Sequence, residues 1–222
     1  MIAGDRPKWF PMWEGECAAI VAAGNSVKRN EVDMLKDRIH VVAINTSYEL
    51  CKWADMLYAC DSVWWQYKDG AKDFKGLKVT QAHEKVMEQW PEIKKVTIRR
   101  DHKAPCHDFI MDKYGEIGGG GNSGFQVLNL LAQFGVTAVA LLGFDMAIIG
   151  EKIHWHGRHP DSGKYIMNNP SEANFRVWRN NFIKAAPKLA ALGIDVVNCS
   201  LESTLGCFPK MNVETALKRW GL

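Results

Sequence analysis

The sequence predicts an α/β protein in which helices cover both faces of a mainly parallel sheet, a three-layer α/β/α architecture. Short apolar segments alternate with longer amphipathic segments along the chain, which is the pattern of strands connected by helices. Most of the apolar segments are continuous, without a polar residue at every second position. Strands of this kind are buried on both faces, as in parallel sheets.

Three strands are expected in the first part of the chain. The first is followed by a turn at residues 23–26, the second by Asn45 and the third by Asp61. Short helices separate these strands, and two weaker strands follow them. The expected strands lie at residues 17–22, 40–44, 54–59, 77–80 and 95–98, and the expected helices at residues 31–36 and 48–53.

The second part of the chain holds the clearest elements. Apolar residues at helical spacing predict a helix at residues 125–134, and the run 138–142 predicts a strand. A long helix is expected at residues 171–192, with Ser171 as its N-cap and Gly193 as its stop. A last strand and a last helix are expected at residues 195–198 and 213–220.

Residues 1–222 are expected to form one domain. The chain is long enough for a full core, and 47% of its residues are hydrophobic. Two stretches without a clear period, at about residues 99–117 and 147–170, are expected to be irregular excursions that set specificity.

Charge and composition argue against several classes of protein. Lys and Arg number 28 and Asp and Glu 25, a net charge of +3, and the two signs are interspersed; nucleic-acid and membrane-surface proteins usually cluster their basic residues. Residues 1–15 lack the apolar stretch of a signal peptide, and the longest nearly apolar run, 134–144, is far short of the roughly 20 residues that span a bilayer. A soluble cytoplasmic protein is therefore expected. Its six widely spaced cysteines, which include no CxxC pair, are expected to be buried thiols.

Polar residues follow nearly every predicted strand. Because the carboxyl ends of parallel strands form the crevice in which ligands bind, we expect a ligand site at this edge of the sheet. The residues at these ends are Gly24, Asn25, Ser26, Asn45, Asp61, Asp145 and Asn198.

A glycine tract precedes the helix at residues 125–134. Gly118 to Gly121 are followed by Asn122, Ser123 and Gly124. Glycines allow close approach of the backbone to a ligand, and the start of a helix favours an anion. The tract matches neither a Walker A loop nor a GxGxxG turn directly after a strand, so a flexible loop closed by an N-cap is the alternative.

Three histidines, His154, His156 and His159, lie within six positions of the second excursion. Such a loop indicates a catalytic or substrate-contacting base, with Asp145 as a further catalytic candidate, or a metal site. The base is favoured, and no metal ligand is assigned, because no Cys lies close in the sequence. Trp64 and Trp65 are expected either to stack on a base or sugar or to pack in the core.

Together these features resemble the Rossmann-like bacterial sialyltransferases. The matching segments are the turn at 23–26, Asn45, the Asn122-Ser123-Gly124 helix start, the Gly143-Phe144-Asp145 strand end, the His loop and the closing segment 197–205. The chain also resembles a related group, the pterin pyrophosphokinase-like proteins that include flagellin glycosylation accessory factors. Phage-encoded proteins of unassigned activity are similar as well.

The sialyltransferase resemblance implies where a donor nucleotide would bind. Asn25, Ser26 and Asn45 would approach the nucleotide and its phosphate. The segment 122–124 would hold the nucleotide or the donor sugar, and Ser200 and Ser203 would lie near the base.

The same resemblance implies the chemistry. One histidine, His159 first and His154 second, would deprotonate the acceptor hydroxyl, and Tyr165 would help to stabilise the leaving phosphate. These enzymes are metal-independent, so no cofactor is expected beyond the nucleotide-activated sugar.

The expected function is therefore a glycosyltransferase that moves a sugar from a nucleotide donor to a glycan or other hydroxyl acceptor. Two alternatives stay open. A diphosphokinase of the pterin type would need Mg²⁺, with Asp61 and Asp145 as its carboxylates. A metal-binding or interaction protein would use the His loop.

Overall fold

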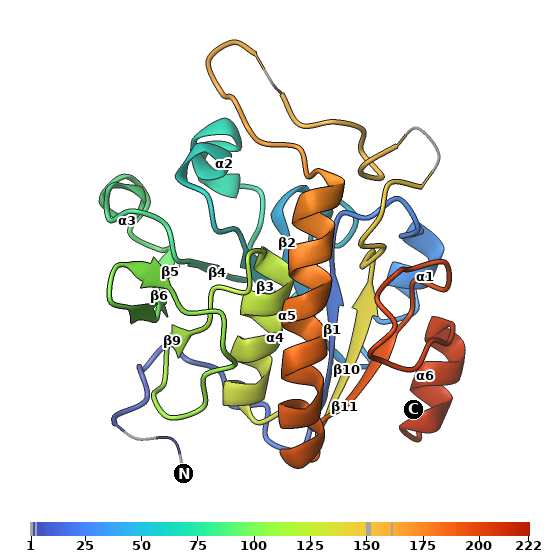
Figure 1. Ribbon diagram of the computed structural model, residues 1–222. Helices are drawn as coiled ribbons and strands as arrows, with labels where there is room; N and C mark the ends of the chain where they lie inside the picture. The colour runs from blue at the N-terminus through green and yellow to red at the C-terminus, as the bar shows by residue number, and fades with distance from the viewer. Residues whose placement is uncertain (1, 3, 150–151, 161) are drawn as a thin grey trace.

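The computed structural model describes residues 2, 4–149, 152–160 and 162–222, and its centre is a seven-stranded sheet. The strand order is β11-β10-β1-β2-β3-β4-β5, and all neighbouring strands run parallel (Figure 1). The strands are β1 (Cys17–Val21), β2 (His40–Ile44), β3 (Met56–Tyr58), β4 (Leu77–Thr80), β5 (Lys94–Lys95), β10 (Ala138–Leu142) and β11 (Asp195–Asn198).

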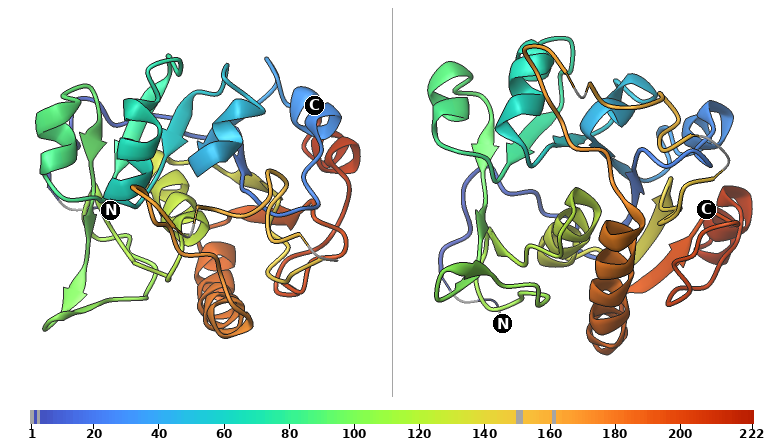
Figure 2. Two further views of the ribbon diagram at one scale, coloured as in Figure 1. Left: turned by 90° about the horizontal axis from the view of Figure 1, so that it is seen from above. Right: turned by 45° about the horizontal axis from the view of Figure 1, so that its top comes forward.

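Helices cover both faces of this sheet, which confirms the three-layer α/β/α architecture. One face packs against α4 (Ser123–Phe134) and α5 (Glu172–Ala191) through a core that includes Ile20 and Phe182. The other face uses the alternate strand residues, such as Val21, and packs against four short helices. These are α1 (Arg29–Asp33), α2 (Ser62–Tyr67), α3 (Lys85–Gln89) and α6 (Val213–Arg219). Figure 2 shows α4 and α5 together on one side of the sheet.

The two long helices begin and end for local reasons. The Asn122 side chain accepts the backbone N–H of Phe125 at the start of α4, and Gly135 ends the helix with φ of 89°. Ser171 and Asn174 form a reciprocal capping box at the start of α5. The expected N-cap Ser171 is thus confirmed, and all residues of α4 are buried.

Several sequence expectations need correction. The helix expected at residues 48–53 is a 3₁₀ turn, η1 (Asn45–Glu49), that begins at Asn45 directly after β2. The strand expected at 95–98 is divided, because the chain leaves the main sheet after β5 and continues as β6 (Thr97–Ile98) in a small separate sheet. The helices α2 and α3 were not expected, since each is only five or six residues long.

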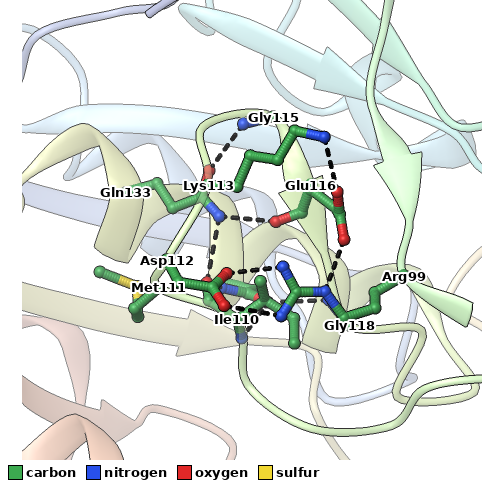
Figure 3. A network of polar contacts seen from close by, with 10 residues as sticks. Arg99, Ile110, Met111, Asp112, Lys113, Gly115, Glu116, Gly118 and Gln133 are labelled. Carbon is green, nitrogen blue, oxygen red and sulfur yellow. Dashed lines mark hydrogen bonds and ion pairs between the residues drawn. The ribbon is translucent and has the colours of Figure 1, made fainter. Parts of the chain in front are cut away.

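The excursion at 99–117 is irregular, as expected, but it is tied closely to α4. It contains β7 (Arg100–Asp101), β8 (Ala104–Pro105) and β9 (Glu116–Ile117), and β9 pairs with β6. Two buried amides of α4 hold it. Asn129 accepts the backbone N–H groups of Ile110 and Gly118, and Gln133 donates to the carbonyl of Glu116. Figure 3 shows the Gln133 contacts.

The structure also decides three smaller questions. Trp64 and Trp65 are 2% and 0% exposed, so they belong to the core rather than to a stacking surface. All six cysteines are free thiols. Within the described residues, no helix has the length and apolar character needed to cross a membrane.

The direction of the connections changes between β1 and β10. From β1 the chain moves outward through β2, β3, β4 and β5, whereas β10 and β11 lie on the other side of β1. Loops leaving the two strands diverge at such a switch point and open a crevice at the carboxyl ends. Figure 1 shows the described parts of the excursion at 147–170 arching over this edge.

Candidate functional site

A cleft of about 370 Å³ opens at the carboxyl ends of β1, β2, β3 and β10. One wall is the glycine turn and first residues of α4, and another is the described part of the His loop. The polar and glycine residues that line it are Gly24, Asn45, Asp61, Gly121, Asn122, Ser123, Gly124, Gly143, Asp145, His154, His159, Asn168, Asn169 and Asn174.

The floor of the cleft is the junction of β1 and β10. The backbone N–H of Gly24 donates to the carbonyl of Gly143 over 2.9 Å, and a Cβ at Gly24 would lie 2.4 Å from that oxygen. Only glycine allows this approach. Asp145 then accepts the backbone N–H of Ser26 over 2.9 Å and its hydroxyl. The carboxylate of Asp145, which is 2% exposed, therefore ties the two strand ends together.

Asn45 is held in an unusual conformation at the end of β2. Its φ is 50°, in the left-handed region that Asn tolerates better than most residues. Its side-chain Oδ1 is buried without a hydrogen-bond partner. Strain and an unsatisfied polar atom at one residue are typical of a ligand-contacting position.

The start of α4 is shaped by close packing of its glycines. A Cβ at Gly124 would lie 2.6 Å from the Phe144 ring, and one at Gly121 would lie 2.9 Å from the Trp178 ring. Larger residues therefore do not fit at Gly121 and Gly124, and this turn lines the cleft. The helix N-terminus carries partial positive charge at this point.

His154, His156 and His159 form a compact group, here called the histidine triad. The ring centroids of His154 and His159 are 4.6 Å apart, and His156 lies 5.2 Å from each of them. The Nε2 atoms of His154 and His156 are buried without partners. His154 and His159 line the cleft, and His156 lies behind them.

Contacts outside the triad hold its loop in place. The backbone N–H of Trp155 donates to the carbonyl of Ala23, and the Trp155 indole donates to the Ser47 hydroxyl. The Asn169 amide both accepts the His159 N–H over 2.8 Å and donates to the His159 carbonyl. Hydrogen bonds thus connect the His loop to the segments that follow β1 and β2 and to Asn169, further along the same loop.

Burial keeps the triad neutral. It lowers the pKa of His154 to about 3 and that of His156 to about 4, with repulsion from His159 as the next cause. Burial also lowers the pKa of His159, while the negative charge of Asp61 raises it. At neutral pH the rings are proton acceptors rather than cations.

Within the described residues, no group of three or more His, Cys, Asp or Glu side chains is arranged to hold a metal ion. The three rings of the triad lie close together, but in the part of the chain that is described their nitrogen atoms are not arranged to hold a metal ion.

The structure brings most of the predicted site residues to the cleft and leaves six outside its lining. Ser200 and Ser203 are buried behind β10, where their hydroxyls bond the backbone N–H and carbonyl of Phe144. Tyr165 packs edge-on against Tyr67 at a centroid distance of 5.9 Å. The six are Asn25, Ser26, His156, Tyr165, Ser200 and Ser203.

Sequence reasoning missed part of the wall near the start of α5. Asn168 and Asn169 precede Pro170, and Asn174, Phe175 and Trp178 follow it. Asn174, Phe175 and Trp178 are one and three positions apart, so they lie on one face of the helix. A second hollow of about 520 Å³ adjoins the cleft and shares Cys60 and Asp61 with it.

Comparison with known proteins adds little. No protein-family model matches the chain, and no curated protein matches its sequence. One solved structure with a similar chain trace is the sialyltransferase CstII from Campylobacter jejuni, in complex with a substrate analogue, cytidine-5'-monophosphate. The match covers 89% of this chain and 85% of that chain, with 10% sequence identity and a TM-score of 0.49. Similarity at this level says nothing about the ligand or activity of this chain.

Proposed function

We propose that this protein is a transferase that binds a nucleotide-activated sugar in the cleft and passes the sugar to an acceptor hydroxyl. The observation that carries the proposal is the pairing of two walls. One is the start of α4, which favours an anion, and the other presents the neutral imidazoles of His154 and His159. A phosphate and a proton acceptor are the two groups that this reaction has to position.

The donor phosphate is assigned to the start of α4. The first N–H groups of a helix have no partner within the helix. The Asn122 side chain takes that of Phe125, which leaves those of Ser123 and Gly124 for a ligand or water. These donors would stabilise charge that develops on the leaving phosphate.

The transfer step needs only groups that the cleft contains. The acceptor oxygen attacks the sugar carbon bonded to the phosphate, and the bond from that carbon to the phosphate oxygen breaks. The bonding electrons leave with the nucleotide, and the hydroxyl proton goes to His154 or His159. The unpartnered Oδ1 of Asn45 is suited to a ligand N–H or O–H, and the adjoining hollow has room for an acceptor.

A thermal-shift screen tests the binding half of the proposal. The panel contains cytidine, uridine, guanosine and adenosine nucleotides and their nucleotide sugars, cytidine compounds first because of the sequence resemblance to sialyltransferases. A ligand present at 100 times its Kd should stabilise the fold by about 2.7 kcal/mol. If no member of the panel stabilises the protein, the proposal fails.

Release of nucleotide from the bound nucleotide sugar tests the catalytic half. His154→Gln and His159→Gln should keep nucleotide binding within a few-fold, and loss of the general base should slow transfer by about 10²-fold or more. His107→Gln is the matched control, because His107 is exposed and lines neither the cleft nor the adjoining hollow. Unchanged transfer in both cleft variants would contradict the assigned base.

The diphosphokinase alternative depends on Asp61 and Asp145 as Mg²⁺ ligands. Both line the cleft, but the two carboxylate oxygens of Asp145 already accept hydrogen bonds from Ser26. We therefore give this alternative second place. Activity that depends on Mg²⁺ and is lost on chelation would reverse the order.

A further inference from the structure

The histidine triad is an unusual wall for a cleft that takes a phosphate. Its three rings lie within 5.2 Å of one another, and two of their Nε2 atoms are buried without partners. Phosphate sites are more often lined by Lys or Arg. The described lining of this cleft contains neither.

Among the residues that the structure describes, few charged groups surround the triad. Glu49 and Lys68 lie near His156, but they form an ion pair with each other at 2.6 Å. On the β10 side, Asp145 is held by Ser26. On its own loop, Arg158 is exposed to solvent.

Asp61, at the end of β3, is the carboxylate that acts on His159. It lines the cleft together with that ring. His159 is therefore the ring whose positive charge the surroundings oppose least. Burial, with repulsion from His159 and His156, disfavours the His154 cation and lowers the pKa of His154 to about 3, although the Ala23 backbone partly offsets this.

We propose that the cleft takes up one proton on His159 when a ligand phosphate enters, so that the anion is bound between the start of α4 and a newly formed imidazolium. The proposal rests on the proposed function. Without a ligand, the charge of Asp61 alone does not balance an added charge on His159 against the cost of burial, and the rings remain neutral. A phosphate supplies that balancing charge, and by linkage the protein binds it more tightly as the pH falls.

Proton uptake separates two tasks among the histidines. The His159 imidazolium faces the phosphate that becomes the leaving group. His154 stays neutral, with Nε2 free to take the acceptor proton. The proton taken up by His159 on binding and the acceptor proton taken by His154 both return to solvent when the products leave, so the cycle is balanced.

Isothermal titration calorimetry with CMP-N-acetylneuraminate and UDP-glucose tests the inference. The phosphates of both probes are esterified and keep a constant charge between pH 6 and 8. Titrations in Hepes and in Tris, with EDTA present, give the number of protons exchanged from the difference in buffer ionisation enthalpy. We expect uptake approaching one proton per bound probe and a Kd that rises up to tenfold per pH unit.

Variants assign the proton to a residue. His159→Gln should abolish the uptake and flatten the dependence of Kd on pH, His154→Gln should retain the uptake, and the exposed His107→Gln should match the wild type. If His159→Gln does not fold, the wild-type pH dependence still decides whether a proton is taken up. Binding of a probe without proton exchange, or full uptake in His159→Gln, overturns the inference and leaves the proposed function intact. If neither probe binds, and no nucleotide sugar of the thermal-shift panel binds in their place, both the inference and the proposed function are overturned.

Discussion

At the scale of single residues, Asn45 is the clearest sign of a functional position. A left-handed conformation costs an L-residue about 1–2 kcal/mol, less for Asn, and the surrounding structure has to maintain it. Its buried Oδ1 has no partner, although buried polar atoms are normally hydrogen-bonded. Both costs are explained if a ligand completes the site.

Asn45→Gly should separate stability from binding. Glycine removes the conformational cost and is expected to raise the free energy of unfolding by up to about 1 kcal/mol. The lost side-chain contact should weaken nucleotide binding by about three- to tenfold, the size of one hydrogen bond. Chemical denaturation and calorimetric titration measure the two effects.

Asp37→Gly is the matched control for Asn45→Gly. Asp37 has a φ of 58° but is exposed and away from the cleft. Its replacement should stabilise the fold without changing nucleotide affinity. Equal affinity in both glycine variants would show that Asn45 does not touch the ligand.

At the scale of elements, the β1 and β10 ends determine the shape of the cleft floor. Gly24 and Gly143 bring two turns into backbone contact, and Asp145 joins them through Ser26. These glycines and Asp145 look like ordinary turn residues in the sequence. The sheet order is what pairs Gly24 with Gly143 and Ser26 with Asp145, in each case across 119 positions.

Gly24→Ala should therefore damage the junction. The added Cβ would lie 2.4 Å from the Gly143 oxygen and 2.7 Å from the Asp145 carboxyl carbon, so the turns must separate. We expect a loss of about 1–3 kcal/mol in the free energy of unfolding, as for overpacked cores. Urea denaturation measures it.

Gly206→Ala serves as the comparison for Gly24→Ala. No atom lies within 4 Å of a Cβ added at Gly206, and its φ is not in the left-handed range. Its stability should stay within about 0.5 kcal/mol of the wild type. A similar loss in both variants would mean that close packing at Gly24 is not the cause.

At the scale of the whole molecule, ion pairs brace the excursion at 99–117 internally, and hydrogen bonds from α4 attach it to the rest of the fold. The Arg99 guanidinium bonds both Asp112 and Glu116, and the Glu116 carbonyl accepts from Gln133 of α4 (Figure 3). The hydrogen bond from Arg99 lowers the pKa of the Glu116 carboxyl below its usual value. The excursion is therefore secured partly by charge.

This lowered pKa predicts a dependence of stability on pH. A carboxyl whose pKa is lower in the folded state contributes stability above its unfolded pKa and loses it as the pH falls through the folded value. The free energy of unfolding should decrease more steeply between about pH 5 and about pH 3 in the wild type than in Glu116→Gln. Urea denaturation across this range tests it. Replacing the exposed Glu88 by Gln should leave the slope unchanged.

Much of the architecture is predictable because strands and long helices carry local signals. The runs at 138–142 and 195–198 coincide with β10 and β11, and Ser171 caps α5. The short helices α2 and α3 carry too few residues to show a period, and were missed. Asn129 and Gln133 are buried polar residues on an apolar helix, and nothing in the helix itself shows that backbone groups of a distant loop satisfy them.

The candidate site was likewise predictable only in part from the sequence. Local patterns were enough to predict the strand ends, the glycine turn and the histidine loop, since each is a short segment with its own chemistry. Which of these residues face one another depended on packing, because a strand order that reverses at β1 brings the start of α4 and the His loop to opposite walls of one cleft. Packing also placed Ser200 and Ser203 behind β10 and buried the histidine triad, since side-chain direction and desolvation arise only when distant segments meet.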